Sequence, residues 1–191
     1  MGRKILIGAV LLIFVFIIVV STRPSTFHIE RSMSIAAPPE VAFAEVNDFH
    51  RWAKWSPFEN LDPQMTKTFE GPASGPGASY AWKGNDKAGE GRMTIEKVQQ
   101  GALISIKLQF LKPFPATNTA TFTFAPEGTG SRVTWAMDGN NNFMSKLFQM
   151  FMNMDKMVGP DFERGLASLK TVAETAAKNA PPPAAPIKPA P

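Results

Sequence analysis

The chain has 191 residues, 44% of them hydrophobic, which suits one well-packed domain and excludes two domains of ordinary size. It contains no cysteine and two histidines, which excludes disulfides, thiolate nucleophiles, cysteine-bound zinc or iron–sulfur centres and histidine-rich metal sites. Lys and Arg total 20 against 16 Asp and Glu, but the basic excess lies in the two end segments. We do not expect nucleic-acid binding, because the clustered positive charge that it needs is missing.

The N-terminal segment is strongly apolar. Residues Ile5–Val20 form an unbroken apolar run, and Ser21 and Thr22 extend the uncharged stretch to 18 residues. At about 1.5 Å per residue, a helix of this length spans about 27 Å, close to the hydrocarbon thickness of a bilayer. We therefore predict a single transmembrane anchor over residues 1–25. The alternative is a cleaved signal peptide, which has a shorter apolar region of about 7–15 residues and a small-residue cleavage site that Val19-Val20-Ser21 matches poorly.

The charges that flank this segment predict its orientation. Arg3, Lys4 and the terminal amine precede the apolar run, and only Arg23 follows it closely. Under the positive-inside rule, the short N-terminal tail stays in the cytoplasm and the rest of the chain is exported. The predicted protein is single-pass, with its domain on the periplasmic or extracellular face of a membrane.

A domain is predicted over residues 26–178, and it begins with a strand and a helix. Apolar side chains alternate along Phe27–Ile35, with Arg31 as the exception, which is typical of a strand with one buried face. Two adjacent prolines suit the first turn of a helix predicted over residues 38–47. A loop rich in aromatic residues is predicted over residues 48–58.

Further strands are predicted from residue 65 to residue 137. Turn residues separate short stretches of alternating polarity, which favours an antiparallel meander over a parallel α/β sheet. The predicted strands are Met65–Glu70, Ser79–Lys83, Gly89–Gln99, Leu103–Phe110, Thr117–Phe124 and Ser131–Met137. The side chains predicted to face inward include Met93 and Ile95; Ile104, Ile106, Leu108 and Phe110; and Val133, Trp135 and Met137.

Helical periodicity replaces this alternation after residue 142. A short helix is predicted over residues 143–152, and a longer one carries apolar residues three and four positions apart from Met154 to Ala173. We expect the longer helix to restart at Gly159-Pro160. The predicted fold class is α+β, with a curved antiparallel β-sheet over a long C-terminal α-helix, preceded by one transmembrane helix. Residues 179–191 are rich in Pro and Ala and are predicted to form a disordered tail.

The order of these elements, together with several motifs, carries a family resemblance. The motifs are Ile35–Val41, Trp52–Phe58, Tyr80–Gly84, Gly89–Met93, Val133–Trp135 and Gly159–Lys170. From about residue 27 to residue 177, the sequence resembles the SRPBCC superfamily, which includes polyketide cyclase/dehydrase-like, lipid-transfer START-like and pollen-allergen-like proteins. The resemblance implies a helix-grip fold, in which the sheet wraps around the C-terminal helix. It does not fix a function, because the group contains both carriers and cyclases.

We predict an apolar pocket between the sheet and the long helix. Aromatic and methionine side chains suit a cavity for a small hydrophobic molecule, which Tyr80 and Asn118 would orient. The alternative is an ordinary core, in which the aromatic residues of the loop over residues 48–58 only staple that loop to the sheet. The residues expected to line the pocket are Trp52, Trp55, Phe58, Tyr80, Trp82, Met93, Leu108, Phe110, Asn118, Phe122, Trp135, Met137, Phe162 and Leu166.

Other candidate sites are weaker. His50 and Asp48 lie close together in the sequence and could form an acid–base pair, but we favour an exposed loop histidine. Glu40, Glu45 and Asp48 are expected on a solvated helix face. We expect turns at Gly71, Gly75 and Gly77. These glycines are followed neither by the Lys-Ser/Thr pair nor by the helix of a phosphate-binding loop.

The function we favour is a membrane-anchored, non-enzymatic binding module that encloses a small hydrophobic or lipid-like ligand. Its expected partners are that ligand and the membrane; we expect no cofactor or metal and assign no catalytic residue. The alternative is a polyketide cyclase- or hydrolase-like enzyme that uses the same cavity, with Tyr80, Asp48 and His50 as its candidate titratable groups. A third hypothesis is a structural envelope module that binds another protein.

Overall fold

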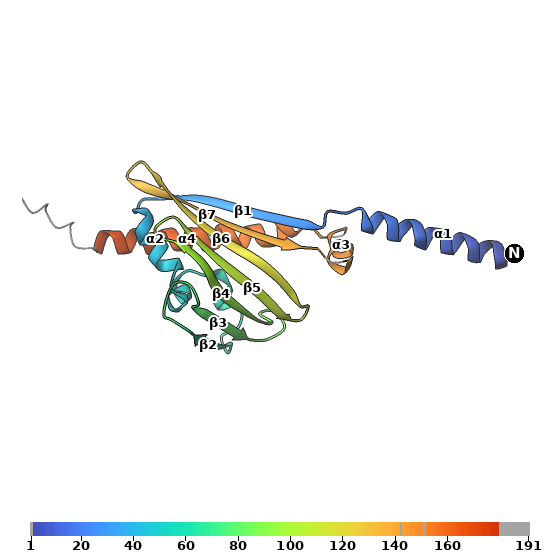
Figure 1. The fold of residues 1–191 in the computed structure, drawn as a ribbon, viewed down its shortest axis with the longest axis horizontal. Coiled ribbons are helices and arrows are strands. Elements are labelled where there is room, and N and C mark those ends of the chain that lie inside the picture. The colour runs from blue at the N-terminus through green and yellow to red at the C-terminus, as the bar shows by residue number, and fades with distance from the viewer. Residues whose placement is uncertain (1, 142, 151, 180–191) are drawn as a thin grey trace, which may run out of the picture.

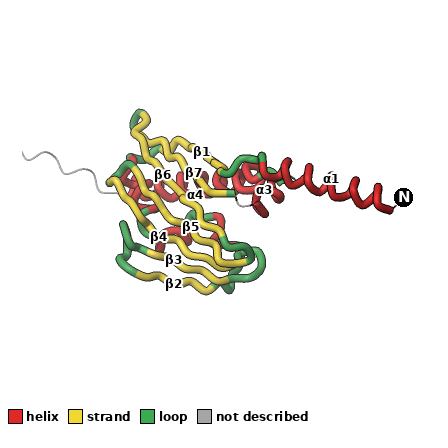
Figure 2. Tube along the Cα trace, turned by 45° about the vertical axis from the view of Figure 1, so that its right-hand side comes forward, coloured by secondary structure: helices red, strands yellow, loops and turns green. Residues whose placement is uncertain are grey.

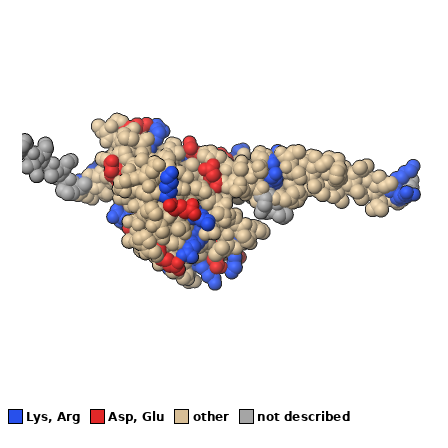
Figure 3. Space-filling model, in the orientation of Figure 1, with Lys and Arg blue, Asp and Glu red and all other residues tan. Residues whose placement is uncertain are grey.

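The computed structural model describes residues 2–141, 143–150 and 152–179 (Figure 1). Helix α1 (Gly2–Ser21) projects from one end of a domain of strands and helices, and Figure 2 shows the same arrangement from another side. This helix is long and apolar enough to cross a membrane, and its surface is uncharged between basic ends (Figure 3). A signal sequence meets the same criteria. From residue 180 onward, the predicted tail lies outside the described residues.

Seven antiparallel strands form one sheet in the order β1-β7-β6-β5-β4-β3-β2. They are β1 (Thr26–Ile35), β2 (Thr66–Glu70), β3 (Ser79–Lys83), β4 (Glu90–Gln99), β5 (Leu103–Lys112), β6 (Ala116–Glu127) and β7 (Gly130–Asn140). Consecutive strands from β2 to β7 are neighbours, so the predicted meander is confirmed, and β1 completes the sheet beside β7. The alternation of β6 gives this sheet one apolar face, because its threonines point away from the core while Phe122 and Phe124 are buried.

Helix α4 (Met154–Asn179) crosses one face of this sheet and runs along β1 (Figures 1 and 2). Its buried stripe consists of Phe162, Leu166, Leu169 and Ala173, spaced three or four residues apart. Helix α2 (Pro39–Val46) packs against both α4 and the sheet. The side chains predicted to face inward from β4, β5 and β7 are buried or half-buried in this core. The α+β helix-grip prediction is therefore confirmed.

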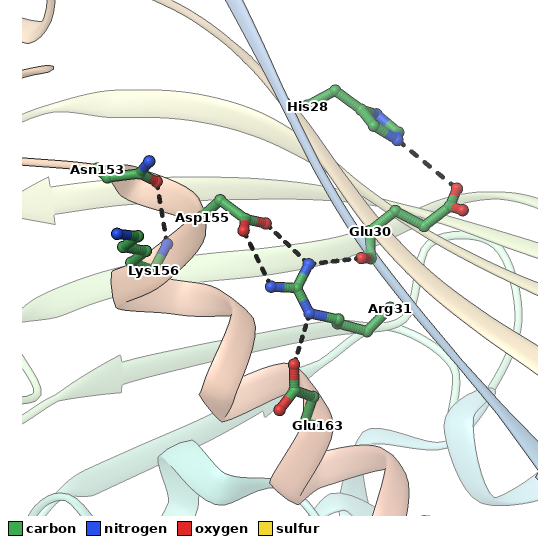
Figure 4. Close-up of polar contacts among 7 residues, drawn as sticks. All are labelled: His28, Glu30, Arg31, Asn153, Asp155, Lys156 and Glu163. Atoms are coloured by element: carbon green, nitrogen blue, oxygen red, sulfur yellow. Dashed lines mark hydrogen bonds and ion pairs between the residues drawn. The ribbon is translucent and has the colours of Figure 1, made fainter.

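The predicted restart of the long helix at Gly159-Pro160 is wrong, because α4 is continuous through both residues. The guanidinium of Arg31 on β1 bridges the helix on both sides of the proline. It contacts Asp155 (Nη1 to Oδ1, 2.8 Å) before the proline and Glu163 (Nε to Oε1, 2.7 Å) after it (Figure 4). A Cβ atom at residue 159 would collide with the same guanidinium, so glycine leaves room for this position of the Arg31 side chain. The apolar stripe of α4 also packs on the core on both sides of the proline, so tertiary contacts support a continuous helix against the local helix-breaking signal.

Two other segments differ from the prediction. Residues 48–58, predicted as a loop, contain the 3-10 helix η1 (Phe49–Lys54) and the start of a second one, η2 (Pro57–Asn60). The Asp48 carboxylate accepts a hydrogen bond from the backbone N–H of His50 (2.9 Å) and so caps η1, which local sequence pattern did not reveal. Helix α3 (Phe143–Gln149) is shorter than predicted and lies beside the end of α1.

Candidate functional site

A cavity of about 420 Å³ lies between α4, the sheet and the chain from η1 to β2. Its wall is mostly apolar, and its predicted lining residues come from eight different elements. These residues are Trp52 and Phe58; Tyr80 and Trp82; Met93; Leu108 and Phe110; Asn118; Trp135 and Met137; and Phe162. The predicted alternation of the strands therefore brings residues that are far apart in sequence to one enclosed space.

Trp135 occupies the centre of the aromatic wall. Its ring stacks on Phe162 of α4, with centroids 4.1 Å apart, and on Phe122 of β6, at 4.8 Å. The ring of Phe58 meets Trp135 edge-on at 6.1 Å. These contacts fix the helix, the sheet and the loop around the cavity, so its wall is built from packed rather than freely moving rings.

Three predicted lining residues, Trp55, Phe122 and Leu166, lie in the packed core and not on the cavity wall. The indole of Trp55 donates to the backbone carbonyl of Glu45 (3.1 Å). The indole of Trp52 likewise donates to the carbonyl of Val46 (2.9 Å), although this ring also faces the cavity. The two tryptophans thus attach their segment to the end of α2. Sequence periodicity alone does not distinguish this structural role from a place on a pocket wall.

One polar group of the cavity depends on contacts that the sequence did not predict. The Tyr80 hydroxyl donates to Glu59 Oε1 (3.0 Å), and the other carboxylate oxygen of Glu59 pairs with the Lys67 ammonium. The Glu59 side chain is only 8% exposed. Burial, and then the negative charge of Glu59, raise the pKa of Tyr80 well above its ordinary value. Tyr80 therefore keeps its proton and presents a hydroxyl that is already engaged by a carboxylate.

Asn118 provides a second polar group, deeper on the sheet. This residue is 8% exposed, and its amide nitrogen contacts the Met137 sulfur at 4.0 Å. A thioether is a weak hydrogen-bond acceptor, so the amide retains capacity to bind a stronger one. Asn118 is thus placed to hydrogen-bond a polar atom of an otherwise apolar occupant.

His50 and Asp48 form a pair outside this cavity. The His50 Nδ1 atom lies 2.9 Å from Asp48 Oδ1, and the imidazole stacks on Phe69 at 4.1 Å on the surface. Partial burial opposes ionisation of Asp48, but hydrogen bonds from His50, together with the charges of His50 and Arg51, lower the pKa of Asp48. The pair therefore stabilises the start of η1 and does not reach the cavity.

The comparisons with known proteins agree with this geometry. A family model described as polyketide cyclase / dehydrase and lipid transport matches residues 26–174. The chain belongs to this family. Its SRPBCC resemblance is thereby confirmed, whereas no curated protein matches the sequence.

Solved structures share the fold of this polyketide cyclase / dehydrase and lipid transport domain. Protein CV1439 from Chromobacterium violaceum is 17% identical with a TM-score of 0.55, over 79% of this chain and 98% of its own. Protein SA2116 from Staphylococcus aureus is 12% identical with a TM-score of 0.58, over 81% and 97%. A protein from Thermobifida fusca is 19% identical with a TM-score of 0.57, over 78% and 93%. At these identities, the likeness concerns the fold alone.

Several cavity residues of this family member escaped sequence reasoning. Met154 and Val158 belong to the apolar stripe predicted for the long helix, at four-residue spacing before Phe162, but the prediction did not place them on the cavity wall. Ala120 has the same strand parity as Asn118 on β6, and Asp161 lies beside Phe162 within α4. The others lie in loops or short 3-10 helices, where no periodicity marks a facing direction. The full set that was missed is Ser56, Glu59, Leu61, Met65, Lys87, Ala88, Ala120, Met154, Val158 and Asp161.

The structure also shows where two weaker candidates lie, the glycines between β2 and β3 and the carboxylate of Glu45. Gly71, Gly75 and Gly77 lie in the turns between β2 and β3, each with a positive φ angle. Glu45, expected on a solvated face, is instead buried, with its carboxylate 2.9 Å from Arg51 Nη1. Among the described residues, no three His, Asp or Glu side chains are grouped in a way that could hold a metal ion.

Proposed function

We propose that this chain is a membrane-anchored, non-enzymatic module that encloses a small hydrophobic or lipid-like molecule in the cavity beneath α4. The observation that carries the proposal is the cavity itself. Its volume of about 420 Å³ and its mostly apolar wall suit one small ligand. Each ligand CH₂ group that leaves water for this wall contributes about 0.8 kcal/mol to binding. Asn118 and the Tyr80–Glu59 pair add a small number of polar contacts that orient the ligand.

The anchor is the second part of the proposal. Helix α1 carries Arg3 and Lys4 before its apolar run and Arg23 after it, with no charged residue between. This pattern supports an uncleaved span with the domain outside the cytoplasm, on the periplasmic or extracellular face. In this arrangement the domain stays close to the membrane surface.

An enzyme that uses the same cavity is the alternative function, and one observation favours it. Of its candidate titratable groups, Tyr80 faces the cavity, whereas Asp48 and His50 lie elsewhere. The raised pKa of Tyr80 makes its hydroxyl a poor base near neutral pH, because little of it is ionised there. The carboxylates on the cavity wall are already paired, Glu59 with Tyr80 and Lys67, and Asp161 with Arg164. We therefore prefer the binding module.

Native mass spectrometry of the full-length chain, extracted from its own membrane in mild detergent, tests this proposal. We expect a reproducible mass increment from one bound molecule, which solvent extraction of the same sample then identifies as an apolar or lipid-like compound. An unloaded chain in repeated preparations, with no compound recovered on extraction, would contradict the proposed function.

A further inference from the structure

One end of the sheet is tied directly to α1. Strand β1 starts there at Thr26, opposite Asn140 at the end of β7. The link between α1 and β1 is short and held in place. The backbone N–H of Asn141 donates to Ser25 O (2.8 Å), and Lys146 Nζ of α3 donates to Ser21 O (3.2 Å). This end of the domain, called here the α1-proximal end, is therefore fixed beside the last turn of α1 (Figure 1).

The register of the sheet shows which other segments share the α1-proximal end. Glu90 pairs with Lys112, and Thr66 pairs with Lys83, so the start of β2, the β3–β4 turn and the β5–β6 turn all lie there. Helix α4 also begins there, because Asp155 in its first turn contacts Arg31 of β1, whereas Lys170 Nζ reaches Ser34 O further along the same strand. Figure 2 shows these turns gathered at one side.

The cavity opens at this same end. Leu61 and Lys87 are the lining residues that are exposed to solvent. Leu61 lies just before β2, and Lys87 lies in the β3–β4 turn, which a hydrogen bond from Trp82 Nε1 to Ala88 O (3.0 Å) holds over the opening. Met154, the first residue of α4, completes the rim. All of these segments belong to the α1-proximal end.

The exposed apolar side chains of the domain concentrate around this opening. In the described part of the chain outside α1, every strongly exposed large hydrophobic side chain except Phe69 lies at the α1-proximal end. These side chains are Leu61, Leu111, Phe114, Phe143, Met152 and Met157. Phe114, in the β5–β6 turn, is 69% exposed. A clustered apolar surface of this kind is typical of a contact with a protein or a membrane.

We infer that the α1-proximal end rests on the surface of the membrane that α1 crosses, and that the cavity receives its ligand from the lipid at this contact. The inference rests on the proposed function. The fixed link selects a lipid surface over a protein partner, because it holds the exposed apolar side chains next to the bilayer that surrounds α1. Charges here have both signs, as in the Lys112–Glu90 pair (3.0 Å), so apolar contact dominates over electrostatic attraction.

This geometry identifies the class of ligand as an amphipathic membrane lipid. An apolar chain that moves from the bilayer through the rim into the cavity stays out of water, and so avoids a cost of about 0.8 kcal/mol for each exposed CH₂ group. The polar head group then lies at the opening, near Lys87, while the chain lies against the aromatic wall.

Single-cysteine labelling tests this orientation, since the natural chain has no cysteine. Full-length Phe114→Cys and Met157→Cys variants are labelled with an environment-sensitive fluorophore in vesicles of phosphatidylcholine and phosphatidylglycerol. The matched control is Thr129→Cys, in the exposed β6–β7 turn at the opposite end. With nitroxide-labelled lipids, we expect at least twofold stronger quenching at residues 114 and 157 than at residue 129. Equal quenching at all three positions would overturn the membrane contact.

Native mass spectrometry of the same vesicle samples separates this inference from the proposed function. A bound lipid together with strong quenching at residues 114 and 157 supports both. A bound lipid without preferential quenching overturns the inference and leaves the proposed function standing. Preferential quenching with an unloaded cavity overturns loading from the bilayer and contradicts the proposed function as well.

Discussion

At the residue scale, charged side chains connect separate elements through ion pairs that the sequence pattern does not show. Arg31 breaks the apolar alternation of β1, and its guanidinium contacts Asp155 and Glu163 on α4 (Figure 4). Glu59 lies beside Lys67, 8 residues later in the chain, and Tyr80, 21 residues later. The sequence pattern assigns no partner to either group, and tertiary contacts decide where they lie. Long-range ion pairs of this kind leave no periodic signal in one sequence.

The Arg31 cluster predicts a pH-dependent stability. Its hydrogen bonds to Asp155 hold the pKa of that carboxyl below its ordinary value. A carboxyl whose pKa falls on folding stabilises the folded state above its unfolded pKa, and this contribution disappears as pH falls through the folded pKa. We expect Asp155→Asn to lower the urea midpoint at pH 7, with the difference from the natural chain shrinking below about pH 4, near the unfolded pKa of Asp. Asp86→Asn, in an exposed turn, is the control. A difference that stays constant from pH 7 to pH 3 would contradict this linkage.

At the element scale, the sequence predicted the strands more accurately than the helix boundaries. Each predicted strand is present, because alternation along segments such as Thr117–Phe124 directly encodes one buried face. The proline in Gly159-Pro160 predicted a helix start, yet α4 begins at Met154, since the contact with β1 outweighs a local signal. Cavity residues were predictable where strand parity placed them and not where loops did, as at Leu61 and Lys87.

At this scale, we predict that α1 anchors the chain in the membrane. We expect the full-length chain to stay with membranes through a carbonate wash, because an apolar helix satisfies its own backbone hydrogen bonds in lipid. Leu12→Arg should weaken insertion by roughly 2.5–3.5 kcal/mol on the translocon scale, whereas Leu12→Ile should leave it unchanged. Recovery of a soluble chain that starts near Thr22 would instead identify α1 as a signal peptide.

At the scale of the whole molecule, three features lie along one axis. Helix α1 leads to one end of the sheet, the exposed apolar side chains other than Phe69 lie at that end, and the solvent-exposed lining residues of the cavity lie there too. Family membership explains the curved sheet and the long helix, since these recur in distant structures with little sequence identity. The family match covers residues 26–174. The placement of the opening relative to α1 needed the register of the sheet, which the sequence alone does not supply.

The most direct test of ligand binding in this cavity is to fill the cavity with a larger side chain and to measure how much ligand remains bound. Ala120 lies on the cavity wall, whereas Ala125 is exposed further along β6, so Ala120→Phe and Ala125→Phe add the same side chain inside and outside the cavity. We expect native mass spectrometry of membrane-extracted full-length chains to show at least a fivefold loss of the bound molecule for Ala120→Phe and no loss for Ala125→Phe, with both variants folded by circular dichroism. Unchanged occupancy in a folded Ala120→Phe chain would contradict the claim that this cavity holds the ligand.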